Sequence, residues 1–198
     1  MLRRLAGPVL ASVMLGAGVP GARAGDAGSP GPAKTTTAEG FKSLVAALSG
    51  SWALAVRSEP QQDGTPATES TGTARWYTSA GGQVLLEDEH MTIQSAELRL
   101  LGLIWWDGKR EALAGMLCSN RSPRTCDPKA SLDDIRLSWE RGRLLIEEKE
   151  HQRDGSVLLF RESYSEITPR SYLQTGEIGP PDGPFRRIFT VHGTRSKN

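Results

Sequence analysis

The sequence has little of what most recognisable active sites require. It contains three histidines, His90, His151 and His192, but no H-x-H or H-E-x-x-H pattern relates them. A zinc site visible in the sequence is therefore excluded. No G-x-S-x-G motif marks a nucleophilic serine either. We accordingly predict no catalytic residues and favour a non-enzymatic protein, while an enzyme that uses residues outside known motifs stays open.

A long apolar run is absent beyond the N-terminus. There, residues 1–4 form a basic head, residues 5–19 are apolar, and Ala22-Arg23-Ala24 supplies a small-x-small cleavage pattern. This arrangement is typical of a signal peptide. A membrane anchor is the weaker alternative, because the apolar run is shorter than the ~20 residues that cross a bilayer. We predict cleavage near Ala24/Gly25, a periplasmic or secreted protein, and no membrane span after processing.

An excess of charge of one sign is also missing. Lysine and arginine number 24, and aspartate and glutamate 23. Removal of residues 1–24 takes away three arginines and no acid, which leaves a net charge of about −2. Because nucleic-acid binding depends on a basic surface that neutralises phosphates, we predict no nucleic-acid partner.

Composition divides the rest of the chain into two parts. Residues 25–37 are rich in Gly, Ala, Ser, Pro and Thr, and they have too little apolar surface to offset the entropy cost of ordering. We predict a flexible tether there. Residues 38–198 are long enough to bury one substantial core, so we predict a single domain.

Cysteine is scarce, with only Cys118 and Cys126 in the chain. In an exported protein, two cysteines eight positions apart most simply form one disulfide across a short polar loop. A redox or metal-binding pair is the alternative, but the chain has no C-x-x-C and no histidine near the two cysteines.

The folded part begins with a helical pattern and continues with strand patterns. Phe41, Leu44, Val45 and Leu48 recur at helical spacing, which predicts one short helix over residues 38–48. After Gly50, short runs rich in β-branched and aromatic residues alternate with turn formers every eight to twelve positions. These runs predict ten strands, over 52–58, 73–78, 84–93, 98–106, 112–118, 135–140, 144–151, 157–167, 171–177 and 185–192.

The connections between these runs indicate hairpins. Residues that accept positive φ, which tight hairpin turns demand, follow many of the runs. Successive hairpins make an antiparallel meander, and ten meandering strands hide their edges most easily by closing into a barrel. We therefore predict an all-β barrel with one short N-terminal helix over one end; a two-sheet sandwich is the alternative. The connections are Gly81-Gly82, Asp107-Gly108, Arg141-Gly142, Asp154-Gly155 and Asp182-Gly183.

Five segments, in their order along the chain, together resemble an uncharacterised family of secreted bacterial lipocalin-like proteins. This family lies in the wider calycin group that includes nitrobindin. The resemblance implies a lipocalin-like barrel with a cavity, and it does not fix a function. The segments are Ser49-Gly50-Ser51-Trp52, Gly81-Gly82-Gln83-Val84-Leu85, Gly102-Leu103-Ile104-Trp105-Trp106-Asp107, Arg161-Glu162-Ser163-Tyr164 and Asp182-Gly183-Pro184-Phe185.

The resemblance also raises the question of haem. Nitrobindin-like members hold haem through a histidine near the end of the chain, and His192 occupies such a position. The sequence around it, Val191-His192-Gly193-Thr194-Arg195, does not match their pattern well. We therefore predict no cofactor and no metal, with His192 as the candidate if either is bound.

Aromatic residues make up only 6% of the chain, but they include five tryptophans that lie almost entirely in predicted strands. Because Trp105 and Trp106 are adjacent, one must face the interior and the other the exterior. The exterior one would be a point of self-association. Arg161 would either anchor an acidic ligand or pair with an acid at the barrel mouth, and we favour the pair. The predicted ligand-binding residues are Trp52, Trp76, Trp105, Arg161 and Tyr164.

Two acidic runs, 87–89 and 147–150, suggest the paired carboxylates of sugar chemistry. Alternation places Glu87 and Glu89 on one strand face and Asp88 on the other, and we predict that most of these acids lie on a solvated outer face. With no reaction indicated, the favoured function is non-enzymatic binding of a small, largely apolar ligand inside the barrel. The alternatives are an enzyme that uses the interior as its active site and a filled barrel that acts in protein contact.

Overall fold

A computed structural model describes residues 37–61, 64–93, 96–120, 126–152 and 154–196. The predicted signal peptide and nearly all of the predicted tether lie outside these residues. The first helix, α1 (Ala38–Leu48), begins where predicted, because the Thr37 side chain accepts a hydrogen bond from the Gly40 amide at 3.1 Å. Among the helices of the described ranges, none combines the length and apolarity needed to span a membrane.

Ten strands follow α1, as the sequence predicted. A turn of 3-10 helix, η1 (Ala80–Gly82), separates the second strand from the third. The strands are β1 (Gly50–Ser58), β2 (Thr68–Ser79), β3 (Val84–Ile93), β4 (Ala96–Asp107), β5 (Ala112–Ser119), β6 (Ile135–Glu140), β7 (Arg143–His151), β8 (Val157–Ser165), β9 (Ser171–Gly179) and β10 (Arg186–Arg195).

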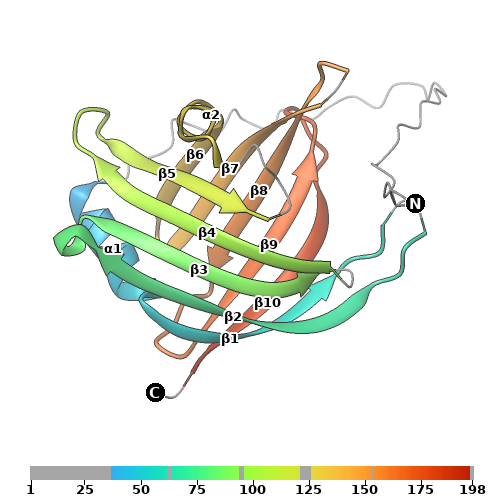
Figure 1. Ribbon diagram of the computed structural model, residues 1–198, viewed down its shortest axis with the longest axis horizontal. Coiled ribbons are helices and arrows are strands. Elements are labelled where there is room, and N and C mark those ends of the chain that lie inside the picture. Colours follow the sequence, from blue (N-terminus) through green and yellow to red (C-terminus); the bar gives the residue numbers. More distant parts are fainter. Residues whose placement is uncertain (1–36, 62–63, 94–95, 121–125, 153, 197–198) are drawn as a thin grey trace, which may run out of the picture. The chain divides into compact units, whose positions relative to one another are not determined.

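The strands form one antiparallel sheet in the order β5-β4-β3-β2-β1-β10-β9-β8-β7-β6. The first and last strands pair along their length, from Trp52 opposite Arg195 to Ser58 opposite Phe189, so the meander curls into a barrel (Figure 1). The seam lies between β5 and β6, the two ends of the sheet order. This confirms the predicted all-β, nearly closed barrel.

A second helix, α2 (Pro128–Asp134), lies against β5, β6 and β7 at the seam (Figure 1). The Asp127 side chain caps it by accepting from the amides of Lys129 and Ala130, and Pro128 occupies its first turn. The sequence analysis missed this helix, because seven residues are too few to show a helical period. It covers unpaired strand edges that an open seam would expose.

One end of the barrel is closed by α1, whose Phe41, Leu44 and Leu48 are buried. Trp52 lies directly beneath the helix and donates from Nε1 to the Leu48 carbonyl at 2.9 Å. The Arg195 guanidinium lies 4.2 Å from the centre of the Trp52 ring. Arg195 also donates to the carbonyls of Ser49 at 2.5 Å and Pro169 at 2.7 Å. The last strand is thereby fastened to the helix and the first strand.

This fastening explains the glycine of the Ser49-Gly50-Ser51-Trp52 segment. Gly50 has φ of 141°, and a Cβ atom there would lie 2.1 Å from Arg195 Nη1. Any other residue would be strained by the positive φ, and its side chain would displace the guanidinium.

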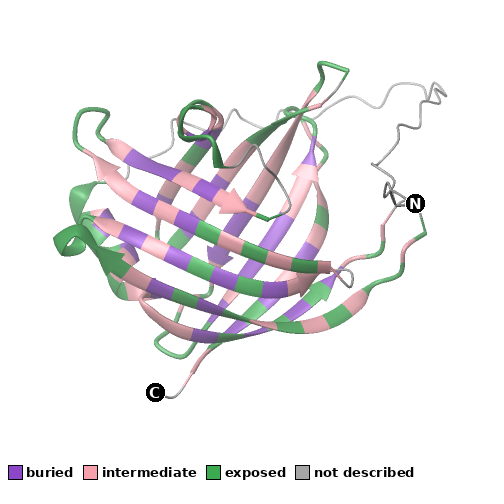
Figure 2. Ribbon diagram, viewed as in Figure 1, coloured by how far each residue is buried: buried purple, intermediate pink, exposed green. Residues whose placement is uncertain are grey.

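Burial alternates along the strands, as the purple and green bands of Figure 2 show. In β1, for example, Trp52, Leu54 and Val56 are buried while Ala53 and Ala55 are exposed. One face of each strand therefore points into the barrel.

Candidate functional site

A group of polar side chains lies inside the barrel, enclosed by the hydrophobic core. Glu87 and Glu89 come from β3, Glu162 and Tyr164 from β8, and Gln174 from β9; each is at most 5% exposed. The strand period places them there, because Leu85 and Met91, on the same face of β3 as the two glutamates, are also buried. The prediction of a solvated outer face was therefore wrong for Glu87 and Glu89.

Hydrogen bonds join the group across the barrel. The Tyr164 hydroxyl lies 2.9 Å from Glu87 Oε1 and 3.1 Å from Glu162 Oε1. The Gln174 amide nitrogen donates to the Tyr164 oxygen at 3.1 Å and also to Glu162 Oε1. The consecutive strands β8 and β9 thus share one network with the distant strand β3, where Glu89 also has a hydrogen bond with Gln174. We call this group the carboxyl cluster (Glu87, Glu89, Glu162, Tyr164 and Gln174).

The geometry requires a proton on one of the carboxyl groups. A tyrosine hydroxyl has a single proton to donate, yet the Tyr164 oxygen contacts both Glu87 and Glu162. It donates to one of them and must accept from the other. That other carboxyl is therefore a neutral acid.

Burial favours the neutral acid at all three glutamates. The pKa values of Glu87 and Glu89 are raised well above the usual value of 4.5, first by desolvation and then by repulsion from neighbouring carboxylates. Desolvation also raises the pKa of Glu162, against the opposing hydrogen bonds from Gln174 and Tyr164. In the described part of the chain, no basic group contributes to these shifts. The carboxyl cluster is thus without a counter-ion there.

Several buried polar atoms near the carboxyl cluster have no hydrogen-bond partner among the described residues. They are Glu89 Oε1, Gln174 Oε1, the Tyr172 hydroxyl and Trp76 Nε1. An unsatisfied buried polar atom costs about 1–3 kcal/mol, so natural proteins seldom keep one without a reason. The Gln174 oxygen can only accept, and Glu89 Oε1 accepts as well whenever it does not carry the proton.

Aromatic rings surround the carboxyl cluster on the side of α1. The Trp76 and Tyr164 rings meet edge to face, with centroids 5.5 Å apart, and Tyr172 lies 5.5 Å from Tyr164 and 4.8 Å from Trp52. Edge-to-face contacts are favourable for aromatic pairs. These four rings fill the covered end of the interior.

Away from α1, the interior is lined by apolar side chains that are less completely buried. The inward side chains of Leu98, Leu100, Leu137 and Phe160 pack against the core but stay partly exposed. Leu100 pairs directly with Glu89 across the β3–β4 ladder. This half of the interior therefore has partly exposed apolar side chains next to the carboxyl cluster.

A further acid, Glu148 of β7, extends the acidic character toward this half. It pairs with Phe160 on one side and Ile135 on the other. Its pKa is raised to about 7 by desolvation, with repulsion from Glu150, Glu162 and Asp134 adding to the effect.

The predicted ligand-binding residues divide between the two faces of the barrel. Trp52, Trp76 and Tyr164 are buried inside it. Trp105, however, lies on the outer face of β4, because its neighbours Ile104 and Trp106 pack on the core. The structure thus gives Trp106 the interior position for which the sequence analysis had chosen Trp105. A role in ligand binding stays a prediction for the buried three.

Arg161 lies on the outer face of β8, between the inward residues Phe160 and Glu162. It donates to Glu147 Oε1 at 2.6 Å, and its guanidinium lies 3.7 Å from the centre of the Phe185 ring. The pairing with an acid that we favoured is present, but on the exterior surface. Arg161 therefore cannot reach the carboxyl cluster as a ligand anchor.

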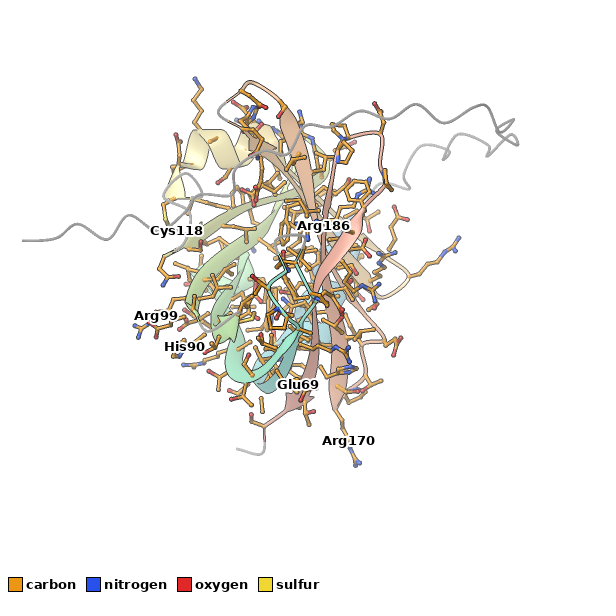
Figure 3. The ribbon with its side chains drawn as sticks, turned by 90° about the vertical axis from the view of Figure 1, so that its right-hand side faces the viewer. Glu69, His90, Arg99, Cys118, Arg170 and Arg186 are labelled. Atoms are coloured by element: carbon orange, nitrogen blue, oxygen red, sulfur yellow. A yellow bond between two sulfur atoms is a disulfide. The ribbon has the colours of Figure 1, made fainter. Side chains whose placement is uncertain are left out.

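His192 is exposed on β10 and lines an outer groove of about 690 Å³ with Arg57 and Glu69. It faces away from the carboxyl cluster, because the inward residues beside it on β10 are Gly193 and Val191, and Val191 pairs with Gln174. His90 lies on the outer surface too, where it meets Glu97 at 2.8 Å (Figure 3). In the described ranges, no three His, Cys, Asp or Glu side chains are arranged to hold a metal ion.

The disulfide between Cys118 and Cys126 is present, as predicted. It joins the end of β5 to the residue next to the cap of α2. The bridge therefore holds the helix that covers the barrel seam.

Comparisons with known proteins identify no family for this chain. No family model and no curated protein match the chain. Among solved structures, a redesigned beta barrel, b11L5F_LGL, matches 83% of this chain and 100% of its own, with 12% identity and a TM-score of 0.38. Rv2717c from M. tuberculosis matches 81% of this chain and 99% of its own, with 12% identity and a TM-score of 0.44.

Proposed function

We propose that the domain is an exported binding protein of lipocalin-like type, which holds a small, largely apolar molecule in the barrel without transforming it. The observation that carries the proposal is the contrast between the two ends of the interior. Four aromatic rings and α1 fill one end, whereas inward apolar side chains at the other end stay partly exposed. Barrels of about eight strands or slightly more are wide enough for one small ligand.

The composition of the open half supports an apolar ligand. Leucines and a phenylalanine supply its wall, and the few polar groups lie next to it in the carboxyl cluster. Binding sites for small molecules commonly have this character, with an apolar lining and a small number of polar groups that fix orientation.

Export is supported by the disulfide between Cys118 and Cys126 and by the leader-like first 24 residues. Structural disulfides persist in oxidising compartments such as the periplasm. A periplasmic or secreted binding protein therefore accounts for both features.

Neighbouring leucines on β4 provide a matched test. Leu100 points inward beside Glu89, whereas Leu101 points outward and is 39% exposed. N-phenyl-1-naphthylamine, a neutral fluorescent probe that brightens in apolar sites, should bind the wild-type domain. Leu100→Trp fills the open half and should weaken binding about tenfold or more, while Leu101→Trp should leave it unchanged. Equal effects of the two substitutions, or no binding at all, would contradict the proposal.

A further inference from the structure

The carboxyl cluster has more acceptors than donors. Each carboxyl offers two oxygens and at most one proton, and the Gln174 carboxamide oxygen is a further acceptor. The permanent donors, the Tyr164 hydroxyl and the Gln174 amide, are already engaged within the group. Glu89 Oε1 and Gln174 Oε1 are buried without a donor among the described residues.

The Gln174 oxygen is the decisive atom, because it belongs to an uncharged carboxamide and not to one of the acids. The side chain is 0% exposed, and its nitrogen is held by Glu162 and Tyr164, which fixes the carboxamide within the group. Its oxygen then lacks a partner, as Glu89 Oε1 does, and the Gln174 side chain is a hydrogen-bond neighbour of the Glu89 carboxyl. Two orphan acceptors from different strands call for a shared donor.

The chemistry of the orphans selects the kind of donor. A carboxylate or phosphate ligand would add acceptors and negative charge beside acids that burial already keeps neutral. An alcohol brings one donor, which cannot satisfy two acceptors. A primary ammonium brings three donors, and its positive charge would let Glu89 give up its proton and pair with it as a carboxylate.

We infer that the ligand of this barrel is a small organic cation, an apolar body with a primary ammonium group, and that Glu89 and Gln174 receive the ammonium. The inference rests on the proposed function, because the apolar body would occupy the open half beside Leu100. The ammonium then reaches the carboxyl cluster next to that half, since Leu100 and Glu89 are direct partners in the ladder.

A series of ligands with one apolar body separates head-group preference from binding itself. Decylammonium, decanol and decanoate would each be titrated against N-phenyl-1-naphthylamine bound to the wild-type domain at one pH, below their micelle concentrations. Charge-assisted hydrogen bonds should make decylammonium roughly tenfold or more stronger than decanol, and decanoate weaker than both.

Variants of β3 assign the preference to a residue. Glu89→Gln keeps the size of the side chain and removes its ability to ionise beside the ammonium, and it should lower the ratio of decylammonium to decanol affinity about tenfold. Asp88→Asn, on the exposed outer face of the same strand, is the control and should leave the ratio unchanged. Circular dichroism would confirm that both variants fold. The comparison of the three decyl compounds on the wild-type domain does not depend on the variants.

The outcomes keep the two proposals apart. If the naphthylamine probe fails to bind, the proposed function is wrong. If the probe binds but the three decyl compounds displace it equally, or decanoate does so best, the proposal of a cationic ligand is wrong and the proposal of apolar binding is retained. If decylammonium is preferred but Glu89→Gln behaves like Asp88→Asn, the assignment to Glu89 is wrong.

Discussion

The Tyr164 hydroxyl lies 2.9 Å from Glu87 Oε1, although 77 positions separate the two residues in the sequence. The contact joins β8 to β3 across the interior of the barrel. Because the same hydroxyl meets Glu162, it also fixes how protons are shared among buried acids. The barrel interior is consequently held by polar contacts as well as by hydrophobic packing.

Loss of that hydroxyl should destabilise the fold. Tyr164→Phe keeps the ring and its contact with Trp76 but leaves buried carboxyl oxygens without a partner, which costs about 1–3 kcal/mol. Tyr77→Phe is the matched control, since Tyr77 lies on the other face of β2, where its ring contacts Arg75. Chemical denaturation measures both. Similar losses for the two variants would show that the shared hydroxyl contributes nothing special.

The sequence predicted the fold well because its dominant signal is local. Alternation and turn residues specify strands and hairpins, and they identified all ten strands and α1. They could not identify α2, which is too short to show a period. They also led to Trp105 instead of Trp106 as the interior residue, because both residues are apolar and the register of β4 decides which one faces the core.

The candidate site was harder to predict. The strand period places Glu87 and Glu89 inside the barrel, but an acidic side chain is normally expected on the surface. Glu87 and Glu89 share a face of β3 with Leu85 and Met91, which was the available signal for burial. Glutamate is almost never buried unless paired, and the partner Tyr164 lies on a strand that only the closed barrel brings near. Such a contact between distant strands leaves no local pattern.

The disulfide should stabilise the domain by closing a short loop. Replacement of Cys118 and Cys126 together by serine removes a link across eight positions, for which the chain-entropy model gives roughly 2–3 kcal/mol. The midpoint of denaturant unfolding should fall accordingly, and reduction of the wild-type protein should lower it by a similar amount. A loss upon substitution without a matching loss upon reduction would point to packing around the sulfurs instead.

Arg195 should contribute more to stability than an ordinary surface arginine. Arg195→Ala removes hydrogen bonds to the carbonyls of Ser49 and Pro169 and uncovers Trp52, and we expect a loss of roughly 2–3 kcal/mol. Arg57→Ala, on an exposed outward position of β1, should change stability by about 0.5 kcal/mol or less. Thermal unfolding distinguishes the two. An equal shift of Tm would contradict the fastening role.

The buried acids should make the domain less stable as pH rises. A carboxyl whose pKa is raised by folding keeps its proton in the folded state after the unfolded chain has lost it. Between the two pKa values stability therefore falls with pH, by up to about 1.4 kcal/mol per pH unit for each such group. For Glu148 this window runs from its usual 4.5 to about 7, and for Glu87, Glu89 and Glu162 it begins at the same value and extends upward.

We accordingly expect the free energy of unfolding to decrease from pH 5 to pH 8. Glu87→Gln should flatten this decrease and raise stability at pH 8, because the neutral amide carries no charge to bury. Asp88→Asn, exposed on the same strand, should leave the profile as it is. Guanidinium unfolding at several pH values gives the slopes. A stability that rises toward pH 8 in the wild-type domain would mean that these carboxyls are ionised and paired when folded, contrary to the contacts of Tyr164.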